Sequence, residues 1–299
     1  MVLILYRGSL FAYPVIFRTE LQHQVQTSKL SSEKRVLEQT AQGKLSGLIF
    51  AQDLPFQLIS FSLTPSVAKG LLDSTNSQTF TTFGLSASLY GSRRWDNNLS
   101  STLGLSLSGL DPESPEVAPQ ALSIVSWQYT PPLKFNFLGG WLPDEKKYGK
   151  FFLIGGFKWK TNEDLTFDLL FPLLLSTKWS SADSNLKYEL FLGAKAEPKS
   201  GYKNEGRFAD AGKRLSLRRK GIALGGKIDG NANKLGWRIS SGVFLKRDAV
   251  VTENYTTIYN QPLPKGLFLE FTVKYPSPDL QEHQQQNNSD ELNELTDQL

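Results

Sequence analysis

Apolar and polar side chains alternate with a period of two along almost the whole chain, and this pattern restricts the fold more than any other feature. In residues 99–109, for example, Leu103, Leu105 and Leu107 alternate with glycine and small polar residues. A period of two places successive side chains on opposite faces of a β-strand. Similar stretches occur at about residues 15–25, 56–64, 80–90, 121–129, 133–141, 150–160, 186–196, 235–246 and 267–275. The sequence therefore predicts an all-β protein.

The hydropathy of the chain excludes a helical membrane protein but not a membrane β-barrel. Hydrophobic residues make up 39% of the 299 residues and charged residues 21%. No run approaches the roughly 18 apolar residues that a membrane helix requires. A strand of a transmembrane barrel needs only about 10 residues, of which every second one faces lipid. Alternation alone also permits a soluble β-sandwich.

Short and long connections alternate between the predicted strands. The short turns are rich in Asn, Asp, Gly and Pro and lie at about residues 96–98, 130–132, 161–164, 182–185 and 229–233. The longer polar connections lie at about residues 27–43, 65–78, 110–119, 142–149, 198–212 and 248–264. This asymmetry is typical of outer-membrane barrels, which have short periplasmic turns and longer external loops. We therefore expect the long connections outside the cell and the turns in the periplasm.

The parity of the turns fixes an even strand number if the chain reverses near Phe171 and Pro172. Proline suits a reversal because it cannot donate a hydrogen bond within a central strand. The count is then about 14 strands, or 12 if the pair before residue 52 does not join the wall. The prediction is a single antiparallel transmembrane β-barrel of about 12–14 strands over residues 13–275.

Aromatic residues support a membrane barrel. All six tryptophans lie within a few residues of a predicted strand end, where an apolar band meets water. The last strand, GLFLEFTVKY, is apolar at every second position and ends in Tyr275. It resembles the C-terminal signal that the barrel assembly machinery recognises, which would make that machinery a partner. It departs from the usual signal because residues 276–299 follow it.

The two ends of the chain have a different composition from the barrel. Residues 1–12 begin apolar but lack a basic leading region, and they are either the remnant of a signal peptide or an N-terminal extension. Residues 276–299 are rich in Gln, Asn, Asp and Glu and contain too few apolar residues for a core. We expect them to form a disordered polar tail.

Two passages carry a family resemblance, FFLIGGFKWKTNEDLTFDLLFPLLLSTKW at residues 151–179 and GWRISSGVFLKRDAVV at residues 236–251. Both combine glycine-bearing strands with characteristic turn residues. From about residue 56 to Tyr275 the chain resembles an uncharacterised family of bacterial outer-membrane β-barrels, known as a domain of unknown function. The resemblance implies a barrel in a bacterial outer membrane. It implies no activity and no functional residues.

The inventory of reactive side chains predicts no enzyme, no cofactor and no metal site. Cysteine is absent, and the only histidines are His23 and His283. A histidine-dependent hydrolase or a zinc site is difficult to assemble from this set. His23 occupies one of the alternate positions that are otherwise apolar in its segment, which favours a packed or interfacial histidine. Paired carboxylates could still hydrolyse a glycoside without histidine.

The polar face of the strands predicts the residues that line the lumen. In residues 186–196 we expect Leu186, Tyr188, Leu190 and Leu192 to face lipid while the alternate positions face inward. The predicted lumen residues are Lys158, Lys160, Asp168, Lys187, Glu189, Lys195, Arg238, Lys246, Glu270 and Lys274. Glu197 shares this parity. Acids and bases on one face predict either ion pairs across a narrow lumen or a pore with a modest excess of positive charge.

Charge also narrows the set of partners. The formal net charge of +4 is small, and the basic residues form no stripe interleaved with aromatics, so we expect no nucleic-acid partner. The basic segment from Arg207 to Lys220 could bind lipopolysaccharide phosphates in addition to the surrounding lipid, or could be a solvated loop. Near Lys220 the apolar positions change from one set of alternate residues to the other. This shift predicts a β-bulge there.

Three functions remain in order of preference. The first is a porin-like channel for small solutes whose identity the sequence does not give, and the second is a structural or adhesive barrel with a plugged lumen. The third group comprises an outer-membrane hydrolase and a soluble β-sandwich binding protein.

Overall fold

The computed structural model describes residues 15–29, 35–50, 56–73, 78–110, 117–142, 150–162, 164–180, 186–196, 200–202, 215–253 and 256–275. The strands are β1 (Val15–Lys29), β2 (Arg35–Phe50), β3 (Leu58–Asp73), β4 (Gln78–Arg94), β5 (Leu99–Ser108), β6 (Ala118–Thr130), β7 (Leu133–Leu142), β8 (Lys150–Lys160), β9 (Leu165–Phe171), β10 (Leu174–Ser180), β11 (Lys187–Ala196), β12 (Ser200–Tyr202), β13 (Leu215–Ala232), β14 (Leu235–Glu253), β15 (Thr256–Leu263) and β16 (Gly266–Tyr275). None of the described residues belongs to a helix that is long and apolar enough to cross a membrane. The segments predicted as leader and tail, residues 1–12 and 276–299, lie outside the described residues.

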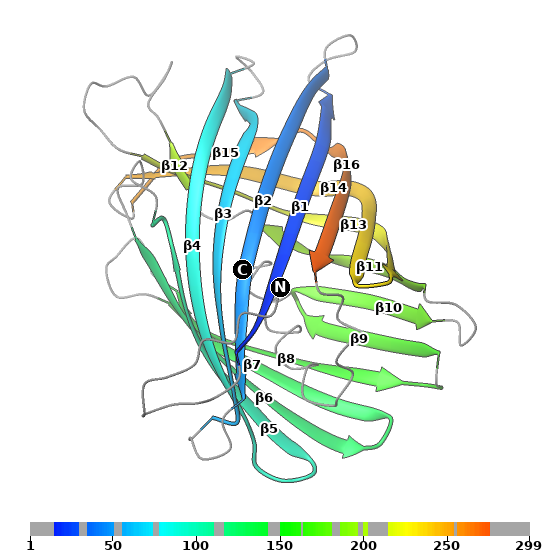
Figure 1. The fold of residues 1–299 in the computed structure, drawn as a ribbon. Coiled ribbons are helices and arrows are strands. Elements are labelled where there is room, and N and C mark those ends of the chain that lie inside the picture. The colour runs from blue at the N-terminus through cyan, green and yellow to red at the C-terminus, as the bar shows by residue number, and fades with distance from the viewer. Residues whose placement is uncertain are drawn as a thin grey trace.

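Fourteen of these strands form a closed antiparallel ring (Figure 1). Each strand from β1 to β10 pairs with the next, β11 pairs with β13, β13 with β14 and β14 with β16. The ring closes between β1 and β16, from the pair Thr19 and Tyr275 to the pair Ser28 and Gly266. The predicted antiparallel barrel with an even strand number is confirmed, and the N-terminal strand pair belongs to the wall.

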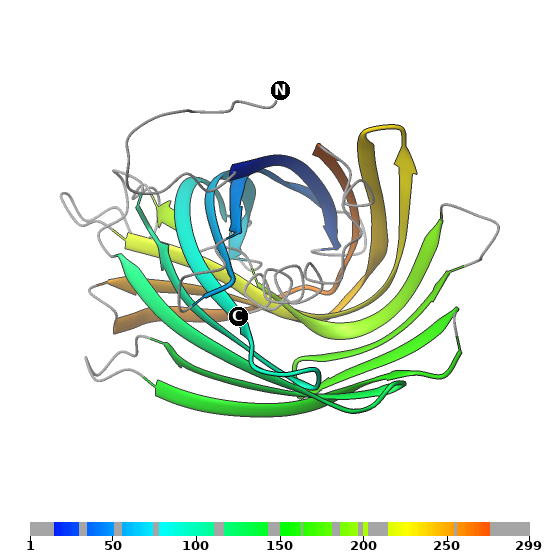
Figure 2. The same cartoon turned by 60° about the horizontal axis from the view of Figure 1, so that its bottom comes forward.

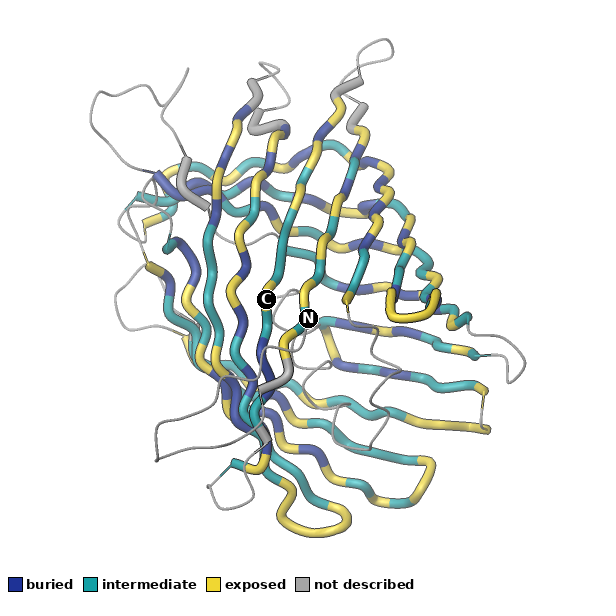
Figure 3. The backbone as a smooth tube through the Cα atoms, in the orientation of Figure 1, coloured by how far each residue is buried: buried dark blue, intermediate teal, exposed yellow. Residues whose placement is uncertain are grey.

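The two faces of the wall differ in the way that the alternation predicted (Figure 3). On β11, Leu190 is 57% exposed while its neighbour Glu189 is 5% exposed. Leu103, Leu105 and Leu107 on β5 are also exposed on the outer face. The apolar outer surface of a closed barrel is removed from water only when the barrel lies in lipid.

Aromatic pairs on β6 to β11 form part of a girdle at the end of the barrel that carries the short turns. Trp179 on β10 stacks on Tyr188 of β11, with ring centroids 5.5 Å apart. Trp127 stacks on Phe135 at 6.0 Å across the β6 and β7 pair. Amphipathic aromatic rings collect where an apolar band meets water. The apolar exterior and this girdle define a bacterial outer-membrane barrel.

The reversal between β9 and β10 falls where the sequence predicted it, because β9 ends at Phe171 and β10 begins at Leu174. Three predicted long connections are wrong. Most of residues 27–43 and 65–78 continues β1 to β4, and residues 248–264 form the end of β14 together with β15. The outward side chains of these strand segments include polar residues such as Gln39 and Lys69. Because both faces are polar there, the alternation is lost and the sequence resembles a loop, although the backbone is extended.

The barrel closes a second time at the end that carries the long connections. Here β12 pairs with both β4 and β13 and bridges the wall. The far half of β14 pairs with β15 while its near half pairs with β16. A smaller ring of β1 to β4, β12, β13, β14 and β16 results, and Figure 2 shows β1 to β4 curving towards β16 beside the wide wall of β5 to β10.

The predicted bulge is present, but on the neighbouring strand. Ile222 of β13 pairs with Lys246, and Ala223 pairs with Phe244, so Leu245 of β14 has no partner in β13. The backbone alternation of β13 continues through Lys220. Its apolar pattern shifts there because Leu215 and Leu217 are buried inside the barrel, whereas Ile222 is 44% exposed on the outer face.

Candidate functional site

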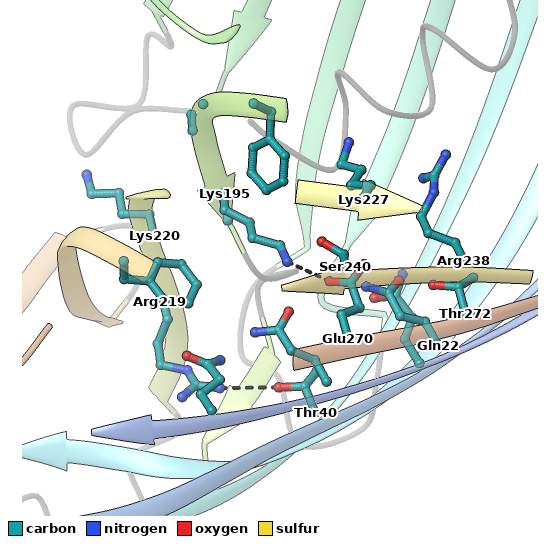
Figure 4. Close-up of a pocket in the computed structure, with 18 of the residues that line it drawn as sticks. Gln22, Thr40, Lys195, Arg219, Lys220, Lys227, Arg238, Ser240, Glu270 and Thr272 are labelled. Atoms are coloured by element: carbon teal, nitrogen blue, oxygen red, sulfur yellow. Dashed lines mark hydrogen bonds and ion pairs between the residues drawn. The ribbon is translucent and has the colours of Figure 1, made fainter. Parts of the chain in front are cut away.

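The lumen contains a polar chamber enclosed by β1, β2, β11, β13, β14 and β16 (Figure 4). Its volume is about 150 Å³. One wall is a ladder of inward residues on β1, namely Glu20, Gln22, Gln24 and Gln26. Lys195, Lys227, Arg238 and Glu270 line the remainder. The chamber therefore presents acids, bases and amides to one another.

Acids and bases in and around the polar chamber form close pairs. The Lys195 ammonium lies 2.5 Å from the Glu270 carboxylate and joins β11 to β16 across the lumen. Lys227 lies 3.3 Å from Glu189 on the adjacent strand. Two further pairs are Arg238 with Asp229 at 2.6 Å and Lys274 with Glu20 at 3.6 Å. Most of this charge is neutralised locally.

A buried ionic latch lies on the long-connection side of the polar chamber. Glu38 of β2 is fully buried and accepts hydrogen bonds from Arg219 of β13 and Arg247 of β14. The two Arg247 contacts measure 2.9 and 3.1 Å, and both arginines are 3% exposed. We call this trio the Glu38 latch. It ties the extensions of β13 and β14 to the opposite wall.

A hydrophobic cap packs beside the Glu38 latch. It joins Ala68 of β3 and Phe80 of β4 to side chains of β13, β14 and β15. The latter are Leu215, Leu217, Ala249, Val251 and Leu263, with Tyr259 packed against them. Ala249 and Val251 have no exposed surface. The extensions of β13 to β15 are thus held against the inner face of β3 and β4.

A second cluster of inward apolar side chains borders the polar chamber, and we call it the apolar layer. It comprises Tyr90, Leu122, Ile124, Leu138, Leu170, Leu174, Phe191, Ala223, Phe244 and Phe268, with Phe152, Ile154 and Leu173 packed against it. Phe191 and Phe268 approach each other from different walls, with ring centroids 6.5 Å apart. Phe191 and Phe244 also line the polar chamber. The lumen is therefore apolar on one side of that chamber.

The end that carries the short turns holds a larger cavity of about 450 Å³. Its lining includes the inward residues Arg94 of β4, Lys134 of β7, and Lys158 and Lys160 of β8. Arg93 also borders it, but its guanidinium lies 4.6 Å from the centroid of the Trp95 ring. No carboxylate occurs among the described residues that line this cavity. We call the cavity the basic mouth.

Five of the ten predicted lumen residues line one of the two compartments. Lys195, Arg238 and Glu270 line the polar chamber, whereas Lys158 and Lys160 line the basic mouth. Asp168 is buried 3.9 Å from Lys178, and Lys187 pairs in register with Asp229. Glu189 and Lys274 form the pairs described above; Glu197 lies outside the described residues.

Lys246 does not line the lumen, which corrects the prediction. Its side chain is 67% exposed and lies 3.7 Å from Asp248. The cause is the bulge at Leu245, which reverses the alternation of β14 and turns Arg247 inward in its place. Parity counting from Arg238 could not detect one extra residue.

Several lumen residues were missed, among them Glu38, Lys134, Arg219 and Arg247. Glu38 lay in a segment predicted as a loop. Arg219 belongs to the basic segment that was expected either to bind lipopolysaccharide or to be a solvated loop, and neither alternative holds for this residue, because its guanidinium is buried against Glu38. Arg207 lies outside the described residues.

His23 does not line the lumen. His23 is exposed on the outer face of β1, between the inward Gln22 and Gln24. His283 lies outside the described residues. Among the described residues, no three His, Cys, Asp or Glu side chains gather as a metal site would require.

No known protein family matches the sequence. No curated protein matches it either. Among solved structures, the chain is similar to the NanC porin, with 9% identity over 86% of this chain and 98% of that one and a TM-score of 0.37. It is also similar to a mutant of the TodX monoaromatic hydrocarbon channel, with 10% identity, coverage of 87% and 90% and a TM-score of 0.42. LpxR from Salmonella typhimurium has 8% identity, coverage of 86% and 99% and a TM-score of 0.34. Similarity at this level carries no functional argument, so the function must be argued from the lumen.

Proposed function

We propose that this protein is an outer-membrane channel for small solutes whose lumen is gated by its apolar layer. The observation that carries the proposal is the division of one closed barrel into a polar chamber and a basic mouth, with inward apolar side chains beside the chamber. A purely structural barrel requires no hydrated compartments of this size. A channel requires polar compartments and a barrier between them.

The chemistry of the apolar layer fits a gate. A narrow passage lined by hydrophobic side chains loses its water and stops ions without a solid obstruction. Phe268 occupies a central place, because it contacts Phe244 at a centroid distance of 5.2 Å and lies beneath the Lys195 ammonium at 4.3 Å. Removal of this ring should widen the passage next to the polar chamber.

Conductance in planar bilayers tests the proposal. We expect the purified protein to produce discrete conductance steps that are rare or small, and Phe268→Ala to make them larger or more frequent. Phe271→Ala on the same strand is the matched control, because Phe271 is 48% exposed on the outer face. It should leave the conductance unchanged.

A structural barrel with a plugged lumen is the second candidate, and the packing of the hydrophobic cap favours it. This candidate predicts silence from the native protein and from Phe268→Ala, in preparations whose heat-modifiable migration demonstrates a folded barrel. Such silence would refute the channel.

A further inference from the structure

We propose that the hairpin of β9 and β10 ends inside the apolar core of the outer membrane, where acyl chains of outer-leaflet lipids cover its tip. The tip comprises residues 171–174, at the end of the barrel that carries the long connections. This end is external in outer-membrane barrels. We call the hairpin the low wall. Its contact with lipid does not depend on conduction through the lumen.

The low wall is too short to cross the apolar core of a bilayer. β9 and β10 contain 7 residues each, whereas β3 and β4 contain 16 and 17 (Figure 1). A transmembrane strand at the usual tilt of about 45° requires about 9–11 residues. Seven residues extend about 23 Å along a strand and therefore about 16 Å along the membrane normal at that tilt. The apolar band of outer-membrane barrels is about 25 Å tall, so a tip anchored by Trp179 in the opposite girdle stops short of its external edge.

The tip of the low wall is apolar throughout. Residues 169–175 read Leu-Leu-Phe-Pro-Leu-Leu-Leu and include the whole turn. Phe171 is 72% exposed and Leu175 is 50% exposed, and both continue the apolar outer face of the wall. Turns in water are usually built from polar residues, glycine and proline. The composition therefore indicates that the lipid-facing surface of the barrel includes this turn.

The neighbouring strand shows that the apolar band continues beyond the tip. Phe171 pairs in register with Gly155 of β8, and β8 continues past this pair towards the external end. Phe151 and Leu153 lie on that continuation and are 84% and 79% exposed. They occupy the same alternate positions as Gly155, so they face outward. Lipid that covers these two side chains also covers the level of the tip.

The backbone of the turn meets a condition for a place in hydrocarbon. Hydrocarbon offers no hydrogen-bond partners, so amide and carbonyl groups there must be paired within the protein. Pro172 has no amide hydrogen. The Leu173 amide donates to the Leu170 carbonyl at 2.6 Å, and the Leu173 carbonyl accepts from the Ala194 amide of β11 at 2.7 Å. These groups therefore need no water.

The low wall also joins the membrane to the apolar layer. Leu170 and Leu174 belong to that layer, and Leu173 packs against it. Phe171 and Leu175 carry the same apolar surface over to the lipid side. A bilayer accommodates a short hydrophobic element by thinning locally. Acyl chains that bend over the tip therefore reach Leu173 at the edge of the apolar layer.

Fluorescence quenching in phosphatidylcholine vesicles tests the proposal, and the absence of cysteine from the sequence allows single labels. The labelled variants are Phe171→Cys and Leu173→Cys at the tip, Leu190→Cys on the lipid face of β11, and Lys69→Cys, an exposed outward position of β3. We expect phosphatidylcholine brominated on its acyl chains to quench both tip labels about as strongly as the Leu190 label. Aqueous iodide should quench them several times less than the Lys69 label, because ions are excluded from hydrocarbon.

Iodide quenching of either tip label at the level of the Lys69 label would place the tip in water and overturn the proposal. Protection of the tip labels from both quenchers would also overturn it, because protein would then cover the tip, and disulfide-linked dimers of Phe171→Cys would identify a second copy as that cover. Quenching of the Phe171 label alone by brominated lipid would overturn the contact at Leu173. Leu175→Cys replaces Phe171→Cys if heat-modifiable migration shows that the latter does not fold.

Discussion

The polar chamber and the basic mouth are lined by the same face of the same wall, yet only the chamber has carboxylates among the described residues that line it. In the chamber, Lys195 lies 2.5 Å from Glu270 and Lys227 lies 3.3 Å from Glu189. In the mouth, Lys134 is paired in register with Lys158. Strand parity decides that a charge faces inward, whereas strand register decides which side chain stands opposite it.

The partner of a lumen charge therefore predicts the effect of removing it. An acid and a base that are buried together stabilise the barrel, and loss of one leaves the other unsatisfied. The chamber should therefore respond to neutralising mutations with instability.

Removal of Glu38 is the most severe test of the paired region. Glu38→Gln would remove the carboxylate that Arg219 and Arg247 share, and loss of one partner from a buried ionic cluster costs about 3–5 kcal/mol. We expect the free energy of unfolding in detergent to fall by this order, as measured by urea denaturation. Glu20→Gln is the control, because Glu20 is 30% exposed beside Lys274 and such pairs contribute at most about 1 kcal/mol. Equal losses would show that the Glu38 latch does not hold β13 and β14.

The polar chamber and the basic mouth both lie inside the barrel only if the opposite face of the wall meets lipid. Leu190→Arg tests this assumption, because Leu190 is 57% exposed between the inward Glu189 and Phe191. An arginine on the lipid face near the bilayer midplane costs roughly 2–4 kcal/mol. We expect poor insertion or a corresponding loss in the free energy of folding into lipid vesicles. Normal folding and insertion of this variant would mean that the faces are exchanged.

Gly70 of β3 tests how tightly the Glu38 latch is packed. A Cβ at this position would lie 2.7 Å from Glu38 Oε2 and would also meet the Arg219 guanidinium. Gly70→Ala should therefore lower the free energy of unfolding by about 1–3 kcal/mol, which is typical of overpacking. In Gly139→Ala the new Cβ would meet its nearest neighbours at 3.8 Å, and we expect little change. Identical urea midpoints for the two variants would contradict a closely packed latch.

The sequence predicted the wall well because period two is a property of each strand by itself. The faces of β5 and β11 and the reversal at Phe171 all follow from local residue types and turns. Strand ends were less predictable, because polar residues beyond the membrane occupy both faces of β1 to β4. The second closure through β12 was not predictable, since it pairs Gly201 with Phe83 across a long stretch of sequence.

The candidate site shows a similar division. Alternation identified the inward positions of Lys158 and Lys195 but could not identify their partners, because register across strands depends on turn lengths and bulges. One unpaired residue, Leu245, moved Lys246 outside and Arg247 inside. The opposition of Lys134 and Lys158 follows only from the pairing of β7 with β8. The compartments could therefore not be distinguished before the register was known.

The smallest predicted effect separates the paired charges of the polar chamber from a charge on the outside of the wall. Lys227→Gln leaves Glu189, which is 5% exposed, without its ammonium partner at 3.3 Å. It should lower the free energy of unfolding by about 1–2 kcal/mol, because a buried carboxylate loses a charged donor. Lys246→Gln makes the same charge change at a side chain that is 67% exposed and 3.7 Å from Asp248, and should lower that free energy less. The measurement is a pair of urea titrations in detergent. Equal losses in the two variants would show that the pairs of the polar chamber contribute no more to stability than an exposed pair.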